Sequence, residues 1–452
     1  MTSHAHSHAI AIDAGARFTR IALLGADGVP ELARLPGSVP GEGLPVPPGA
    51  QHGAALRAAY AAYCAGSGVP DRVVLVVHEQ DRAGQARRAV DTLASVHGTD
   101  RAPRIRVLGT PHAVLALLRH AGVATARYAV CELGASAVEV SVCVPAGASV
   151  AVAGTARHAP DEGYGAGFDR ALLAAVGLPD DDTGLRVLAG LRAQEGAAAR
   201  LGVALRRAVS RGGRYDDTPV HQVDGREITA GVVRVALEQL TADLDHALDR
   251  ALGGDRTPAP GGAPARPAVA VGGAARFAPL AECLAARQGP LVALPGDTDP
   301  ALAAVFGAAL VAAGRVDPGD RYPYAVCVAT HRVVAGVPRQ EELVISRADT
   351  LEPGGATVFA EADGHRLRVA AGPTPAGPAR HVRVRVRDAE GDRTAAVSTV
   401  TVPDGGQDDR FHIGVRIAVD GTAHLVLHPL GSAAPGEFPL GTLPTELKGV
   451  RP

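Results

Sequence analysis

The sequence predicts an α/β amino-terminal domain with two related lobes, followed by a small antiparallel β-domain. Three observations lead to this prediction. A pattern of strand, acidic residue, spacer, glycine and second strand occurs at Asp13–Gly15 and again at Glu132–Gly134. Between residues 10 and 313 the apolar spacing alternates between that of strands and that of helices. Beyond residue 323, valine, threonine, arginine and turn residues dominate, as in antiparallel strands.

Composition places the domain boundaries in a chain that is long enough for two or three domains. We expect a disordered His-rich start at 1–9, a first domain at 10–315, a linker at 316–322, a β-domain at 323–430 and a Gly/Pro-rich tail at 431–452.

In the first lobe, short apolar segments alternate with longer amphipathic ones. We expect strands at 10–13, 21–24, 73–77 and 105–108, a loop at 28–50, and helices at 54–64, 82–97 and 111–121. The continuous apolar run at 73–77 is typical of a strand buried on both faces.

The second lobe begins with a repeat of the first pattern. After Val130–Gly134, residues Val138–Val144 alternate strictly, as in a half-buried strand. We expect helices at 166–176, 191–210, 230–252 and 299–313, and a strand at 268–271 that runs into a glycine pair opening a helix. Such an internal repeat implies two related lobes.

Two signals predict the β-domain. Valine and arginine alternate over Val382–Arg387, which indicates a strand with one solvated face. Asp420-Gly421 lies between the apolar segments 413–419 and 424–428 and is typical of a hairpin turn.

Composition also excludes several classes of protein. The net charge of −2 and an aromatic content of 3% argue against a nucleic-acid partner. No apolar stretch approaches the ~20 residues of a membrane span, and the amino terminus lacks the pattern of a signal peptide. We therefore expect no membrane partner and a cytoplasmic location.

The repeated acid-x-glycine turns are suited to holding a phosphate chain. Backbone N–H groups of a glycine turn can bind phosphate, and an acidic residue at the strand end can hold Mg²⁺ through water. Asp13 and Glu132 are the candidates for that weak, water-mediated metal contact. Gly272-Gly273 would let a ligand approach the backbone at a helix amino terminus.

The order of these motifs resembles the heat-shock protein 70 (DnaK-type) family of actin-like ATPases, in a divergent and shortened form. Ile10–Leu24 and Val130–Val142 resemble its two phosphate motifs, and Tyr164–Asp169, Leu205–Ser210 and Gly272–Arg276 resemble three further ones. The resemblance covers roughly residues 10–313. It implies a two-lobed actin-like ATPase (ribonuclease H-like) domain.

The resemblance also implies a binding site for ATP or ADP with Mg²⁺, and adenine contacts from Arg207, Ser210 and Arg276. Catalytic residues stay unassigned. The implied cofactor-binding residues are Asp13, Gly15, Ala16, Arg17, Glu132, Gly134, Ala135, Ser136, Arg206, Arg207, Ser210, Gly272, Gly273 and Arg276.

The carboxy-terminal part resembles the β-type substrate-binding domain of the same family. Val337-Pro338-Arg339 and Ile413–Leu427 carry this resemblance. It implies a small antiparallel β-sandwich that holds an unfolded peptide or a protein partner.

Departures from the family pattern argue against efficient hydrolysis. Ala16-Arg17 stands in place of two threonines, and Ala135 and Ala137 stand within the second phosphate turn. The only lysine is Lys448, far from either turn. Losing one charge-stabilising donor typically slows a reaction ~10²–10³-fold.

We therefore expect a divergent chaperone that binds ATP or ADP and is at most a slow ATPase. Two alternatives remain open: a scaffold or interaction protein that no longer binds nucleotide, and a small-molecule kinase of the same superfamily.

Overall fold

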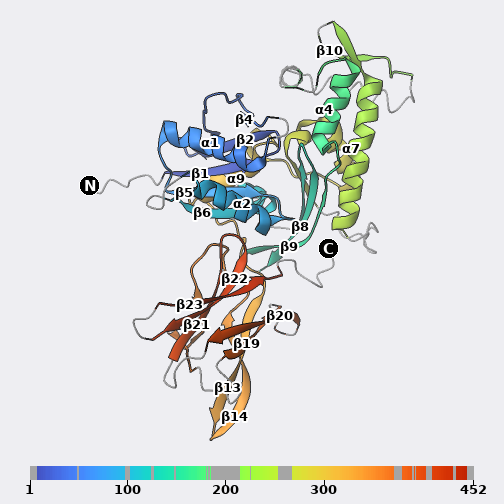
Figure 1. Cartoon of the computed structure of the whole chain (residues 1–452). Helices are drawn as coiled ribbons and strands as arrows, with labels where there is room; N and C mark the ends of the chain where they lie inside the picture. Colours follow the sequence, from blue (N-terminus) through green and yellow to red (C-terminus); the bar gives the residue numbers. More distant parts are fainter. Residues whose placement is uncertain are drawn as a thin grey trace.

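A computed structural model shows a mixed α/β amino-terminal part and a carboxy-terminal part of antiparallel sheets (Figure 1). The residues that the structure describes are 8–47, 50–96, 102–123, 127–146, 149–179, 181, 184, 214–223, 225–252, 267–370, 379–388, 391, 393–403, 410–430 and 434–444. The helix expected at 191–210 lies outside them.

The first sheet has the strand order β3-β2-β1-β5-β6, with β4 paired to β2. Its strands are β1 (Ala9–Ala14), β2 (Phe18–Leu24), β3 (Pro30–Leu32), β4 (Leu44–Pro45), β5 (Arg72–Val77) and β6 (Arg104–Gly109). Strands β1, β5 and β6 are parallel, whereas β2 and β3 run antiparallel to their neighbours.

The second sheet repeats this arrangement with the order β9-β8-β7-β12. Its strands are β7 (Tyr128–Leu133), β8 (Val138–Ala146), β9 (Ser149–His158) and β12 (Ala268–Val271). β7, β8 and β9 form an antiparallel meander, and β12 joins β7 in parallel. Each sheet therefore has a three-stranded meander whose first strand pairs with a later, parallel strand.

Two helices, α3 (Thr110–His120) and α9 (Ala303–Ala312), pack between the two sheets. Their apolar residues contact β1, β2 and β5 on one side and β7, β8 and β12 on the other. The two helices approach each other closely, because a Cβ at Gly307 would lie 1.9 Å from the Ala113 carbonyl oxygen.

Four longer helices cover the outer faces. α1 (His52–Ser67) and α2 (Arg82–Ala94) pack on the first sheet. α4 (Tyr164–Ala175) and α7 (Ala230–Ala251) pack on the second, together with α8 (Ala278–Gln288). A small hairpin of β10 (Pro219–Val223) and β11 (Arg226–Thr229) precedes α7.

The carboxy-terminal part contains two main antiparallel sheets, with the orders β14-β13-β19-β20 and β15-β21-β22-β23. The first comprises β13 (Ala325–Val334), β14 (Val337–Ser346), β19 (Ala379–Arg387) and β20 (Thr394–Pro403). The second comprises β15 (Val358–Phe359), β21 (Arg410–Ile417), β22 (Thr422–Pro429) and β23 (Gly436–Thr442), and β18 (Arg368–Ala370) also pairs with β21. Both sheets contribute to one core, while β16 (Glu361–Ala362) and β17 (His365–Arg366) pair separately.

Two expectations for this part, a strand at the valine–arginine alternation and a hairpin turn at Asp420-Gly421, are confirmed. The valine–arginine alternation forms β19, with Val384 and Val386 buried, and Asp420-Gly421 closes the β21–β22 hairpin. The expected tail was wrong for residues 436–442, which form β23. Its Leu440 is buried in the core that both sheets share. Glycine and proline at neighbouring positions are typical of a tail, so the sequence did not indicate a strand here.

The segment expected as a linker is bound to the amino-terminal part. The amide of Val150 donates to the carbonyl of Gly319 (2.8 Å). The buried carboxylate of Asp320 accepts hydrogen bonds from Arg82 (3.0 Å) and Arg106 (2.5 Å). The segment expected as a loop at 28–50 likewise contains β3 and β4. Among the described residues, no helix has the length and apolar character needed to cross a membrane.

Candidate functional site

A cavity of ≈ 780 Å³ lies between the two halves of the amino-terminal part. Both acid-x-glycine turns and the Gly272-Gly273 pair line it. Of the residues that the sequence singled out for cofactor binding, the cavity is lined by Asp13, Gly15, Ala16, Arg17, Glu132, Gly134, Ala135, Ser136, Gly272, Gly273 and Arg276. Arg206, Arg207 and Ser210 lie outside the described residues.

The two turns share one hydrogen-bond pattern. The amide of Gly15 donates to the carbonyl of Phe18 (3.1 Å), and the amide of Gly134 donates to the carbonyl of Ala137 (3.0 Å). Each turn joins the first two strands of its sheet, so the cavity is flanked by two equivalent hairpins.

Gly272 ends β12 in a conformation that requires glycine. Its φ is +93°, and a Cβ there would lie 2.5 Å from the carbonyl oxygen of Leu133. The next residue differs, because a Cβ at Gly273 would meet no atom within 4 Å. Gly272 thus holds β12 against β7, while Gly273 borders open space.

Arginines of the first hairpin are paired with carboxylates. Arg17 forms an ion pair with Asp169 in the middle of α4, and this contact joins the first hairpin to the second lobe. Arg20 lies opposite Asp13 in the strand register and donates to its Oδ2 (3.2 Å). Burial raises the pKa of Asp13, and the Arg20 charge offsets only part of that effect.

Arg276 also has carboxylate partners. Its Nη2 lies 2.6 Å from Asp299 Oδ2, its Nε lies 2.8 Å from Asp299 Oδ1, and it forms a second ion pair with Glu42. Burial alone would raise the pKa of Asp299, but the hydrogen bonds and charge of Arg276 lower it below its ordinary value. Arg276 therefore bridges the 28–50 segment and the loop before α9.

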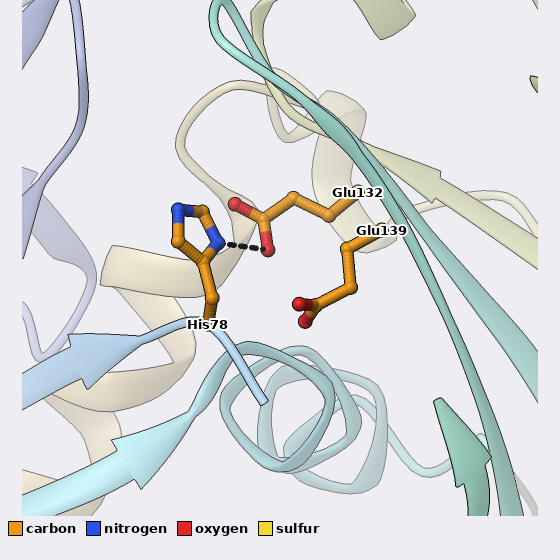
Figure 2. A group of neighbouring side chains, drawn as sticks. All are labelled: His78, Glu132 and Glu139. Carbon is orange, nitrogen blue, oxygen red and sulfur yellow. Dashed lines mark hydrogen bonds and ion pairs between the residues drawn. The ribbon is translucent and has the colours of Figure 1, made fainter. Parts of the chain in front are cut away.

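A histidine and two glutamates, His78, Glu132 and Glu139, lie close together where the two sheets approach each other. His78 follows β5, and its Nδ1 lies 3.1 Å from Glu132 Oε2 (Figure 2). Glu139 on β8 is the register partner of Glu132 on β7. The potential ligand atoms of these three residues all lie within 4.8 Å of one another.

The environment of this group changes all three pKa values. The Glu132 charge raises the pKa of His78 to about 9, although burial acts against it. Burial alone would raise the pKa of Glu132, but His78 and a hydrogen bond from Thr110 lower it. Burial and the Glu132 charge raise the pKa of Glu139 to about 7.

Several residues of the site had not been singled out from the sequence. Asp169, Glu42 and Asp299 are the carboxylates that pair with the cavity arginines, and they are distant from them in the chain. His78 and Glu139 carried a detectable signal. His78 directly follows a buried strand end, and Glu139 occupies a polar position of the alternation at 138–144. That alternation indicated a half-buried strand, which was wrong, because both faces of β8 are buried and Glu139 is buried with them.

No model of a known protein family matches the chain, and a search of curated proteins found no match.

Proposed function

We propose that this protein is a divergent actin-like ATPase, similar to the heat-shock protein 70 family, that binds ATP or ADP in the cavity. The observation that carries the proposal is the cavity itself, which lies between two hairpin turns with the same hydrogen bond in sheets of corresponding strand order. Its volume is within the usual range of ligand pockets, about 300–1,000 Å³.

The charges lining the cavity support weak binding and slow hydrolysis. A triphosphate needs positive groups or backbone N–H donors that are available to it. Arg17, Arg20 and Arg276 are the arginines of the cavity lining, and each is already paired with a carboxylate. A nucleotide would have to compete with these carboxylates, so its affinity is expected to be modest.

The carboxy-terminal part would then hold an unfolded peptide or a protein partner. The support for this half of the proposal is the pair of antiparallel sheets around one core, together with the Val337-Pro338-Arg339 and Ile413–Leu427 resemblance. Coprecipitation with a reduced, unfolded model protein tests it, and retention of that protein by the full chain is expected.

Calorimetric titration of the full chain with ATP and ADP, with and without Mg²⁺, tests nucleotide binding. The matched variant is Gly273→Leu, because Gly273 lines the cavity and a Cβ added there would meet no atom within 4 Å. Arg276→Ala is a poorer choice, since it would leave Asp299 and Glu42 without their cation. Binding that is lost in Gly273→Leu, with an unchanged melting temperature, is the expected result.

One observation favours a second candidate, a scaffold that binds no nucleotide. The arginines of the cavity are paired with carboxylates, and the side chain of Ala135 lines the cavity at the second turn, where it would hinder a phosphate chain. Ala137, the other departure at this turn, is buried and does not line the cavity. Absence of binding at millimolar ATP, with or without Mg²⁺, would favour this candidate over the first.

A further inference from the structure

We propose that His78, Glu132 and Glu139 bind a divalent transition-metal ion of the Zn²⁺ class between the two lobes. This site goes beyond nucleotide binding and does not depend on it. It also differs from a water-mediated Mg²⁺ contact, because here side-chain atoms would contact the ion directly.

The geometry of the three side chains suits one ion. Ligand atoms around tetrahedral zinc lie about 3–3.5 Å apart, because each bond is about 2.0–2.2 Å long. His78 Nδ1 and Glu132 Oε2 already lie 3.1 Å apart, and all three residues offer ligand atoms within 4.8 Å of one another. Figure 2 shows the imidazole of His78 facing both carboxyl groups.

The strand register gives an independent reason for a cation. Glu132 and Glu139 lie directly opposite each other on β7 and β8. Like charges in such a pair destabilise a sheet. In the first lobe the equivalent pair is Asp13 and Arg20, which neutralise each other. In the second hairpin a carboxylate takes the place of that arginine, and the cations nearest to the pair are His78, 3.1 Å from Glu132, and Arg157, the register partner of Glu139 on β9. A bound metal ion would replace the proton of His78 as the positive charge between the two carboxylates.

Outer contacts hold the carboxyl groups in place. Glu139 Oε1 accepts from the amide of Glu79 (2.8 Å), and Oε2 accepts from the amide of Gln80 (3.2 Å). Each of these oxygens keeps a lone pair for an ion. The hydroxyl of Thr110, whose Oγ1 lies 3.3 Å from the carbonyl oxygen of Val77, also interacts with Glu132. Hydrogen-bonded ligand carboxylates of this kind are usual in metal sites.

The mixture of ligands indicates the class of ion. Imidazole suits Zn²⁺, Fe²⁺ or Ni²⁺, whereas Mg²⁺ and Ca²⁺ are bound by oxygen ligands. Three protein ligands leave a fourth position for water or a ligand. Since His78 and Glu132 line the cavity, that position would face it. The ion would also join the lobes, because His78 follows the first sheet and both glutamates belong to the second.

Titration of the metal-free full chain with Zn²⁺, and separately with Co²⁺, tests the proposal. The parent protein for this experiment carries His4→Ala and His6→Ala, because histidines near the amino terminus could bind metal on their own. We expect one ion per chain, visible absorption bands from bound Co²⁺, and no comparable binding of Mg²⁺.

The variants separate a metal site from a structural ion pair. His78→Ala is expected to lower Zn²⁺ affinity by at least about 100-fold and Thr110→Val by about 10–100-fold. Arg157→Gln should raise the affinity for Zn²⁺, because the positive charge of Arg157 acts on Glu132 and would repel a metal ion bound there. The control is His120→Gln at an exposed position, which should leave binding unchanged.

Two results would overturn the site: no ion bound by the parent protein, or Zn²⁺ affinity that is the same in His78→Ala. If His78→Ala does not fold, Zn²⁺ affinity is measured in the isosteric variant Glu139→Gln. An affinity equal to that of the parent protein would then overturn the site. Loss of Zn²⁺ binding without loss of ATP binding, or the reverse, keeps this proposal distinct from the nucleotide site.

Discussion

Neutralising Asp320 is expected to weaken the contact between the two parts of the chain. Its side chain is 0% exposed, and its two oxygens accept from Arg106 (2.5 Å) and Arg82 (3.0 Å). Removing one partner of a buried ion pair typically costs about 3–5 kcal/mol. Here the arginine side chains keep 26% and 19% exposure, so water can partly replace the lost carboxylate. We expect Asp320→Asn to lower the free energy of unfolding by about 2–4 kcal/mol.

The matched control lies three residues earlier in the same segment. Asp317 pairs with Arg321 (2.6 Å), but its side chain is 53% exposed. Surface pairs of this kind contribute about 0.2–1 kcal/mol. Asp317→Asn should therefore change stability much less than Asp320→Asn.

Denaturant unfolding and limited trypsin digestion measure the effect. Trypsin cleavage after Arg315 and Arg321 should become faster in Asp320→Asn, because the segment loses its anchor on β6 and α2. Unchanged unfolding and cleavage, or an equal effect of Asp317→Asn, would refute the assignment of Asp320 as the anchor.

The contacts of Asp320 with Arg106 and Arg82 also predict that the stability of the protein depends on pH. Burial alone would raise the pKa of Asp320, but Arg106 and Arg82 hold it below its ordinary value. A lowered pKa in the folded state stabilises the protein above the unfolded-state pKa of about 3.9, and this contribution is lost as the pH falls through the folded-state value. The stability difference between wild type and Asp320→Asn should shrink below about pH 4.

Other predictions concern packing and the cavity. Gly307→Ala should destabilise the protein by about 3 kcal/mol in urea unfolding, because its Cβ would lie 1.9 Å from a backbone oxygen of Ala113. Gly66→Ala in α1, where a Cβ meets nothing within 4 Å, should stabilise by about 0.5 kcal/mol instead. Asp169→Asn should raise ATP affinity in calorimetry about tenfold, roughly 1.4 kcal/mol, by releasing Arg17 from its charged partner; unchanged or weaker binding would argue against Arg17 as a phosphate ligand.

Much of the secondary structure could be predicted, because its signals are local. The apolar run at 73–77 is β5, the 3–4 spacing at 230–252 is α7, and the alternation at 138–144 is β8. Asp420-Gly421 likewise closes a hairpin, with Gly421 at a φ of +80°. In each case the residues that decide the structure are neighbours in the chain.

Prediction failed where short apolar segments depend on distant partners. β3 lies in a segment expected as a loop, and it is a strand because its backbone pairs with β2. β23 is a strand because it pairs with β22, although its glycine and proline content is typical of a tail. Neither segment has enough local propensity to be recognised alone.

By itself, the sequence determined the repeated hairpins, several of the helices and buried strands, and the change to antiparallel strands near residue 323. Only the tertiary structure decided which charges meet. Arg17 pairs with Asp169, and His78 faces Glu132 and Glu139, across separations that no periodicity encodes. The physical reason is that periodicity reports which face of an element is buried, whereas an ion pair depends on the relative placement of two elements.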